Sequence, residues 1–154
     1  MIHIQSVASG KEYRIGTFEP GMLQYADRDY VFAYIPSELK GCSSIITYGS
    51  DKMISEDQLC FSIVSDMECD VYVLYPDKQP VIPKWLTHFE RMRMNVSRED
   101  SDAMTLKGYF TLYKKHFPPG EIAFFGNSPK EMLGKDWYVK SRGTNYCMYS
   151  VVVK

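Results

Sequence analysis

Hydrophobic residues along this chain alternate with polar ones over short runs, which is the period of a half-buried β-strand. The clearest run is Val71-Tyr-Val-Leu-Tyr75, which is rich in β-branched and aromatic residues and is ended by Pro76-Asp77. The same pattern predicts further strands at 11–15, 31–35, 44–48, 59–64, 91–96, 104–114, 121–125 and 146–153.

Turn residues separate these runs about every 8–12 positions, a spacing typical of an all-β sandwich or barrel. Short helical turns are predicted at 37–40 and at 128–133, where Ser128 would cap the turn and Pro129 would take its first position. Residues 84–89 fit either a short turn or an extended segment, and residues 49–52 and 97–102 are predicted to be loops. We therefore predict an all-β fold, an antiparallel β-sandwich with one or two short helical turns, in a single domain over residues 1–154.

The composition strengthens the β prediction and narrows the classes of partner. The chain has 12 Tyr, 8 Phe and 2 Trp, and aromatic residues favour pleated, half-buried surfaces. Tyrosine also serves binding surfaces, because it offers a large contact area with little entropy to lose. The net charge is −1, from 18 basic and 19 acidic residues, with no basic stripe. Nucleic acid is therefore not predicted as a partner, since phosphate neutralisation dominates such binding.

The cysteines and histidines do not have the spacing of a metal site. The four Cys, at 42, 60, 69 and 147, form no CxxC pair, and the three His, at 3, 88 and 116, are scattered. Cys60 lies in an apolar run and is predicted to be buried, while the redox state of the thiols stays open. We predict no metal and no cofactor.

The chain contains no run of about 18 apolar residues, so we predict no membrane insertion. Its first residues lack the charged and apolar regions of a signal peptide. This favours an intracellular protein, or a secreted one if the chain is a domain excised from a longer protein. The oligomeric state is left open.

No group of residues forms a catalytic signature, so no catalytic residue is predicted. Gly41-Cys42-Ser43 lacks the strand, sharp turn and long helix of a nucleophile elbow. Asp27 and Asp29 flank Arg28, and an ion-paired loop or strand edge is preferred there over a cation site. The segment 126–129, Gly-Asn-Ser-Pro, is interpreted as a turn with a helix cap rather than as an anion site.

Two groups of aromatic residues are the candidate ligand-binding sites. Trp85 follows the proline-rich segment 80–83, where it would either cover the open end of the sandwich or present an exposed stacking platform. The second group lies in residues 135–146, where aromatic rings could stack on sugars or peptide side chains while cationic and amide groups fix orientation. Its predicted ligand-binding residues are Trp137, Tyr138, Arg142, Asn145 and Tyr146.

Several segments carry, in order, a likeness to a known module. They span about residues 22–153 and comprise 25–30, 35–41, 45–47, 59–63, 70–75, 83–86, 113–120, 125–127 and 148–152. This ordered set, with Pro-x-Trp-Leu, Phe-Pro-x-Gly and Gly-Asn, resembles β-sandwich modules found beside secreted polysaccharide lyases and glycosidases. The resemblance implies an antiparallel sandwich that is an accessory, non-catalytic module. We expect the sandwich to be jelly-roll, galactose-binding-like or immunoglobulin-like. The insertion-like stretch 128–145 departs from the pattern.

Three hypotheses for function follow. The first is a non-catalytic recognition module whose ligand is a glycan, favoured by the resemblance. The second is an intracellular interaction or assembly domain with a protein ligand. The third is an enzyme of unrecognised type, in which His88, His116 and several aspartates would converge in space.

Overall fold

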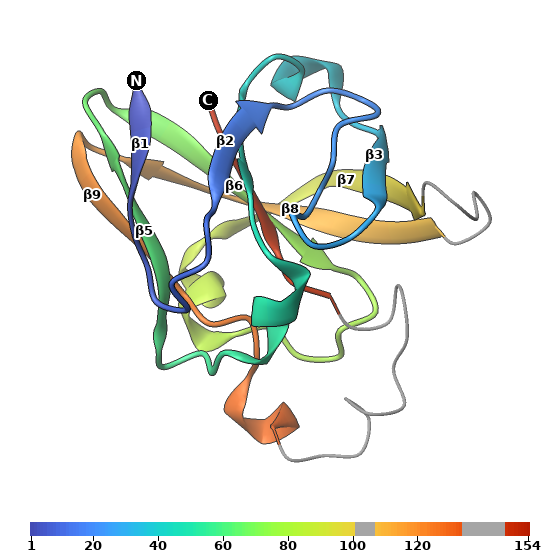
Figure 1. Ribbon diagram of the computed structural model, residues 1–154, viewed down its shortest axis with the longest axis vertical. Coiled ribbons are helices and arrows are strands. Elements are labelled where there is room, and N and C mark those ends of the chain that lie inside the picture. Colours follow the sequence, from blue (N-terminus) through green and yellow to red (C-terminus); the bar gives the residue numbers. More distant parts are fainter. Residues whose placement is uncertain (101–106, 134–146) are drawn as a thin grey trace.

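The computed structural model describes residues 1–100, 107–133 and 147–154, which form two antiparallel β-sheets (Figure 1). The smaller sheet has the order β1-β5-β9, with β1 at Ile2–Val7, β5 at Leu59–Ser65 and β9 at Gly120–Phe125. The larger sheet has the order β2-β4-β10-β6-β8-β7-β3 and curls into a half-barrel. Its strands are β2 (Arg14–Thr17), β4 (Ser43–Ile46), β10 (Ser150–Val153), β6 (Cys69–Pro76), β8 (Lys107–Phe117), β7 (Glu90–Asp100) and β3 (Tyr30–Tyr34).

The predicted all-β, antiparallel fold class is confirmed, although several element boundaries differ from the prediction. Strand β1 was not predicted, even though Ile2 and Ile4 alternate there with polar residues. Strand β2 begins three residues later than expected, because Tyr13 is buried and donates from its hydroxyl to Asp51 outside the sheet.

The predicted loop at 97–102 is wrong over its first four residues, because β7 continues to Asp100. The reason is Arg98, which is only 1% exposed and lies over the ring of Tyr30. Runs of charged residues normally indicate a solvated loop, but here the guanidinium is covered by aromatic rings.

One or two helical turns were expected, whereas the described residues contain four short 3₁₀ turns. These are η1 (Ser37–Leu39), η2 (Gly49–Met53), η3 (Lys84–His88) and η4 (Lys130–Met132). Ser128 does not cap η4 as predicted, because its hydroxyl donates to the carbonyl of Lys52. Pro129 precedes the turn rather than opening it.

Two hydrophobic cores lie on opposite faces of the larger sheet. The first fills the space between the two sheets and includes Val71, Val73 and Tyr75 of β6. The second lies inside the curl of the larger sheet and includes Tyr72 and Leu74 of the same strand. Because β6 is buried on both faces, its residues 71–75 form a continuous apolar run rather than an alternating one.

The larger sheet extends beyond the smaller one on its β8-β7-β3 side (Figure 1). The change from covered to open sheet occurs along β8, since Tyr113 belongs to the first core whereas Tyr109 is 49% exposed. The part of the larger sheet formed by β3, β7 and this end of β8 therefore presents a partly open face to solvent.

Candidate functional site

A bulge in β7 interrupts the open part of the larger sheet. Arg91 pairs with Tyr113 and Asn95 pairs with Thr111, so β7 advances four residues where β8 advances two. Bulges of this kind bend a strand and redirect its side chains, and they are common beside functional sites. The residues between the two pairs, 92–94, therefore have no partner on β8, while exposed and part-buried positions still alternate along β7.

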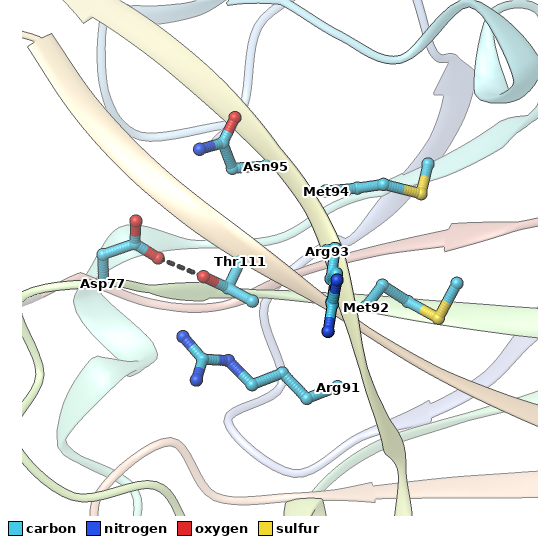
Figure 2. Close-up of a pocket in the computed structure, with 7 residues that line it drawn as sticks. All are labelled: Asp77, Arg91, Met92, Arg93, Met94, Asn95 and Thr111. Carbon is cyan, nitrogen blue, oxygen red and sulfur yellow. Dashed lines mark hydrogen bonds between the residues drawn. The ribbon is translucent and has the colours of Figure 1, made fainter.

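The bulge separates apolar from polar side chains (Figure 2). Met92 and Met94 pack against the second core, on the side of the strand opposite to Asp77 and Thr111. Arg91, Arg93 and Asn95 remain exposed. The bulge therefore presents two guanidinium groups and an amide at one place on the surface.

A polar cleft of about 520 Å³ lies along this bulge. Its lining residues come from β7, β8 and the turn after β6, and they are Asp77, Arg91, Met92, Arg93, Met94, Asn95 and Thr111. An adjoining hollow of about 270 Å³ shares Arg93, Met94 and Asn95 and extends to Tyr34 and η1. We refer to the two hollows together as the β7 cleft.

Hydrogen bonding and charge define the chemistry of the β7 cleft. The Thr111 hydroxyl donates to Oδ1 of Asp77 at 2.5 Å, which fixes the carboxylate at one edge. Neither Arg91 nor Arg93 forms an ion pair with a carboxylate of the described residues. The cleft thus combines hydrogen-bond acceptors with two cations that are available to a ligand.

Two exposed tyrosines flank the cleft in a single row across three strands. Ser97 of β7 pairs with Tyr34 of β3 on one side and with Tyr109 of β8 on the other. The two tyrosines are 60% and 49% exposed. Adjacent strands lie about 4.8 Å apart, so the two tyrosine backbones are separated by roughly 10 Å. Two residues along β7, on the same face, Asn95 pairs with Thr111, which places this row beside the polar cleft.

Sequence reasoning did not single out this face. Tyr34 and Tyr109 lie in predicted strands, but most tyrosines among the described residues are buried, as Tyr75 and Tyr113 are. Their exposure depends on the extent of the smaller sheet and on a register shift between Phe32 and Tyr34. The three charged residues and two methionines at 90–94 were the only available signal.

The sequence-predicted cluster falls where the structure gives no description. Trp137, Tyr138, Arg142, Asn145 and Tyr146 all lie outside the described residues. Their role in ligand binding stays a prediction.

Trp85 lies in η3 and is half-buried against the first core. Its ring packs edge-on against Tyr149 at 5.2 Å and Phe89 at 5.9 Å between centroids. Its Nε1 donates to the carbonyl of Gly126 at 2.9 Å. This environment matches the structural alternative, a tryptophan that covers the core, and a contribution of its exposed part to binding stays a prediction.

The segment 126–129 is a tightly packed junction, in agreement with its interpretation as a turn. A side chain on Gly126 would place its Cβ 2.0 Å from the carbonyl oxygen of Ser55. The main-chain N–H groups of Gly126 and Ser128 donate to the carbonyls of Gln58 and Ile54. These two amides are therefore engaged within the protein and do not point to an anion.

The preferred interpretation of the segment 27–29 agrees with the structure. Nη1 of Arg28 lies 2.9 Å from Oδ2 of Asp27, forming the expected ion pair. The same carboxylate accepts hydrogen bonds from the N–H groups of Gly49 and Ser50 at 2.7 and 3.1 Å, at the start of η2. Asp27 thus caps a turn that is distant in sequence.

The structure also tests the predictions on cysteines, metal ligands and membrane spans. All four cysteines are free thiols, and Cys60 is buried as predicted, which raises its pKa to about 11. Within residues 1–100, 107–133 and 147–154, no three His, Cys, Asp or Glu side chains are grouped to hold a metal ion. No helix in those ranges is long and apolar enough to cross a membrane.

The fold occurs in known glycoside hydrolases. A β-glucuronidase from glycoside hydrolase family 2 superposes on 97% of this chain with a TM-score of 0.73 and 22% identity. An enzyme of glycoside hydrolase family 138 that targets pectin rhamnogalacturonan II superposes on 98% with a TM-score of 0.59 and 11% identity. This chain spans only 14% and 16% of the length of those two chains.

These similarities establish the fold alone, and they agree in part with the resemblance found in the sequence, since both neighbours are glycosidases. No family model and no curated protein matches the chain.

Proposed function

We propose that this protein is a non-catalytic recognition module that binds a glycan in the β7 cleft. The observation that carries the proposal is the row formed by Tyr34, Ser97 and Tyr109, in which two exposed rings flank a polar cleft. Aromatic faces stack on the apolar faces of sugar rings, and neighbouring polar groups satisfy the hydroxyls.

The polar groups beside the tyrosines suit a ligand that is rich in hydroxyls. Asn95 offers both a donor and an acceptor, and the carboxylate of Asp77 is an acceptor that Thr111 holds in place. The larger hollow, at about 520 Å³, lies within the usual range of ligand sites. A glycan chain could therefore occupy the cleft with its rings against the tyrosines.

The structural neighbours support the same proposal. Both are glycosidases, and this fold makes up a small part of each chain. A fold of this size within a much longer enzyme suits an accessory module that carries binding rather than the reaction itself.

A protein ligand is the second candidate, and the same open face favours it. Two exposed tyrosines beside two arginines also form the kind of patch enriched in protein interfaces. In that case the module would dock against a neighbouring domain or protein through the β8-β7-β3 face.

A glycan array and a peptide array, both probed with the whole chain, distinguish the two candidates. We expect glycan hits that are lost in Tyr34→Ala and Tyr109→Ala. Met67→Ala is the matched control, because Met67 is 64% exposed at the turn between β5 and β6. Hits on peptides alone would replace the glycan proposal by the protein one.

Two further measurements test the remaining parts of the proposal. Incubating the bound glycans with the protein should release no shorter product, and such release would contradict the non-catalytic role. Trp137→Ala and Arg142→Ala should leave binding intact if the β7 cleft is the site. Loss of binding in these variants alone would move the site to the sequence-predicted cluster.

A further inference from the structure

We propose that the glycan bound in the β7 cleft is acidic, and that Arg91 and Arg93 hold its carboxylate or sulfate groups. This inference rests on the proposed function and adds the chemical class of the ligand. Its basis is the pair of guanidinium groups that line the cleft.

Arg91 and Arg93 differ from Arg28 and Arg98 in their surroundings. Arg28 is engaged by Asp27, and Arg98 is buried over the ring of Tyr30. Arg91 and Arg93 are exposed and form no ion pair with carboxylates of the described residues. Arg28 and Arg98 thus have partners within the fold, whereas Arg91, Arg93 and Arg14 are exposed. The β7 pair differs from Arg14 because its two guanidinium groups line the same hollow.

The bulge brings these two cations to one site. Arg91 and Arg93 are two residues apart on β7, and Figure 2 shows the Arg91 side chain extended along the side of the strand where Asp77 and Thr111 lie. Met92 and Met94 are anchored in the second core on either side of Arg93, which fixes the backbone from which both arginines project. A planar guanidinium binds carboxylate or sulfate oxygens through two parallel hydrogen bonds.

The charge balance of the larger hollow also favours an anion. In the larger hollow two arginines face the carboxylate of Asp77, which already accepts the Thr111 hydroxyl, and Glu38 lines the adjoining hollow. A neutral glycan would leave both guanidinium groups without an ion-pair contact, whereas an acidic one pairs them. The carboxylate of Asp77 would repel the bound anion only weakly. It would accept a hydrogen bond from a sugar hydroxyl at the edge of the cleft.

The test compares acidic glycans with their neutral counterparts by isothermal titration of the whole chain. One arm uses oligogalacturonate and its methyl ester, and the other uses a sulfated oligosaccharide and its desulfated form. We expect the acidic member of at least one pair to bind about tenfold or more tightly, with an affinity that falls as salt rises. The pair that shows the preference identifies the anion as carboxylate or sulfate.

Variants locate the preference on the protein. Arg91→Gln combined with Arg93→Gln should remove the preference for the acidic member, whereas Arg14→Gln should keep it. Arg14 is a matched control because it is an exposed strand arginine on β2, at the opposite edge region of the larger sheet. Asp77→Asn should tighten binding of the acidic glycan, since it removes the opposing charge and keeps an acceptor for Thr111.

The outcomes separate this inference from the proposed function. Equal binding of acidic and neutral members, or a preference that survives the double variant, overturns the inference and leaves glycan binding in place. No binding of any of these glycans, together with no hit on the glycan array, overturns both.

Discussion

The guanidinium carbon of Arg98 lies 3.7 Å from the centroid of the Tyr30 ring, in a position that leaves only 1% of the arginine exposed. Its Nη2 also donates to the sulfur of Cys147 at 2.9 Å. The contact with Tyr30 holds the C-terminal half of β7 against β3, the edge strand that carries Tyr34. The open face therefore depends on a buried cation beneath it.

Replacing Arg98 by alanine should destabilise the fold markedly. The change leaves a cavity under Tyr30 and removes the cation–π contact, so we expect the free energy of unfolding to fall by about 2–5 kcal/mol. Chemical denaturation measures this loss. Arg14→Ala, on an exposed strand position, should change it by no more than about 0.5 kcal/mol. Equal effects of the two variants would show that the buried contacts contribute little.

Glu56 connects the starts of two separate turns, and its removal should loosen both. Its carboxylate accepts from the main-chain N–H of Lys84, at the start of η3, at 2.7 Å, and from that of Lys130, at the start of η4. Glu56→Ala removes a buried carboxylate and leaves two part-buried main-chain donors without their partner, so we expect a loss of about 2–4 kcal/mol. Glu56→Gln should lose roughly half as much, since an amide offers one acceptor oxygen.

The neighbouring carboxylate gives the control for Glu56. Asp57 is half exposed and pairs with the Lys130 side chain at the surface, where ion pairs contribute about 0–1 kcal/mol. Asp57→Ala should therefore change the denaturation midpoint little. A loss as large as that of Glu56→Ala would contradict the assigned role of the buried carboxylate.

Gly126 should not accept any side chain. A Cβ there would lie 2.0 Å from a main-chain oxygen of Ser55, which cannot move without displacing the segment before β5. We expect Gly126→Ala to cost about 1–3 kcal/mol or more, and to change the fluorescence of Trp85, which donates to the Gly126 carbonyl.

Gly10→Ala separates crowding from backbone strain. Gly10 has φ of +74° with nothing within 4 Å of an added Cβ, so only the left-handed backbone opposes alanine there. This cost is about 1–2 kcal/mol, and the Trp85 signal should stay unchanged. A change of Trp85 fluorescence in Gly10→Ala would mean that this signal reports a general loss of packing rather than the local effect at Gly126.

His116 and Asp70 should make stability depend on pH. Nδ1 of His116 lies 2.8 Å from Oδ1 of Asp70 on neighbouring strands. The hydrogen bond to Asp70 raises the pKa of His116, and the hydrogen bond from His116 lowers the pKa of Asp70. The histidine contribution is complete below its unfolded pKa of about 6.5 and is lost as pH rises through the raised value. The aspartate contribution is present above about pH 4 and is lost as pH falls through the lowered value.

The pair therefore stabilises the fold most between about pH 4 and 6.5. His116→Gln should lower the melting temperature near pH 5.5 and have little effect at pH 9. An equal drop in melting temperature at pH 5.5 and at pH 9 would show that the ionised pair does not contribute.

Some of the fold followed from the sequence because local pattern and burial agree. The run at 71–75 is apolar throughout, and β6 is indeed buried on both faces. The strand at 97–100 could not be predicted, because Arg98 and its neighbours have the composition of a solvated loop. The rings of Tyr25, Tyr30 and Phe110, from three separate segments, surround that charge and favour its burial.

The candidate site was less predictable than the fold. The β7 bulge is set by the register between two strands, and no residue type in 91–95 encodes it alone. Tyr34 and Tyr109 are exposed because the smaller sheet ends before them, which is a long-range property. Trp85, which the sequence did single out, packs against Tyr149 and Phe89.

Mapping of the binding surface by amide chemical shifts tests the central proposal most directly. The labelled protein would be titrated with a glycan that scores on the array, and the shifted residues would be located on the fold. We predict that the largest shifts occur at Tyr34, Asn95, Ser97, Tyr109 and Thr111. Shifts confined to residues 135–146, or absent throughout, would contradict the assignment of the β7 cleft as the glycan site.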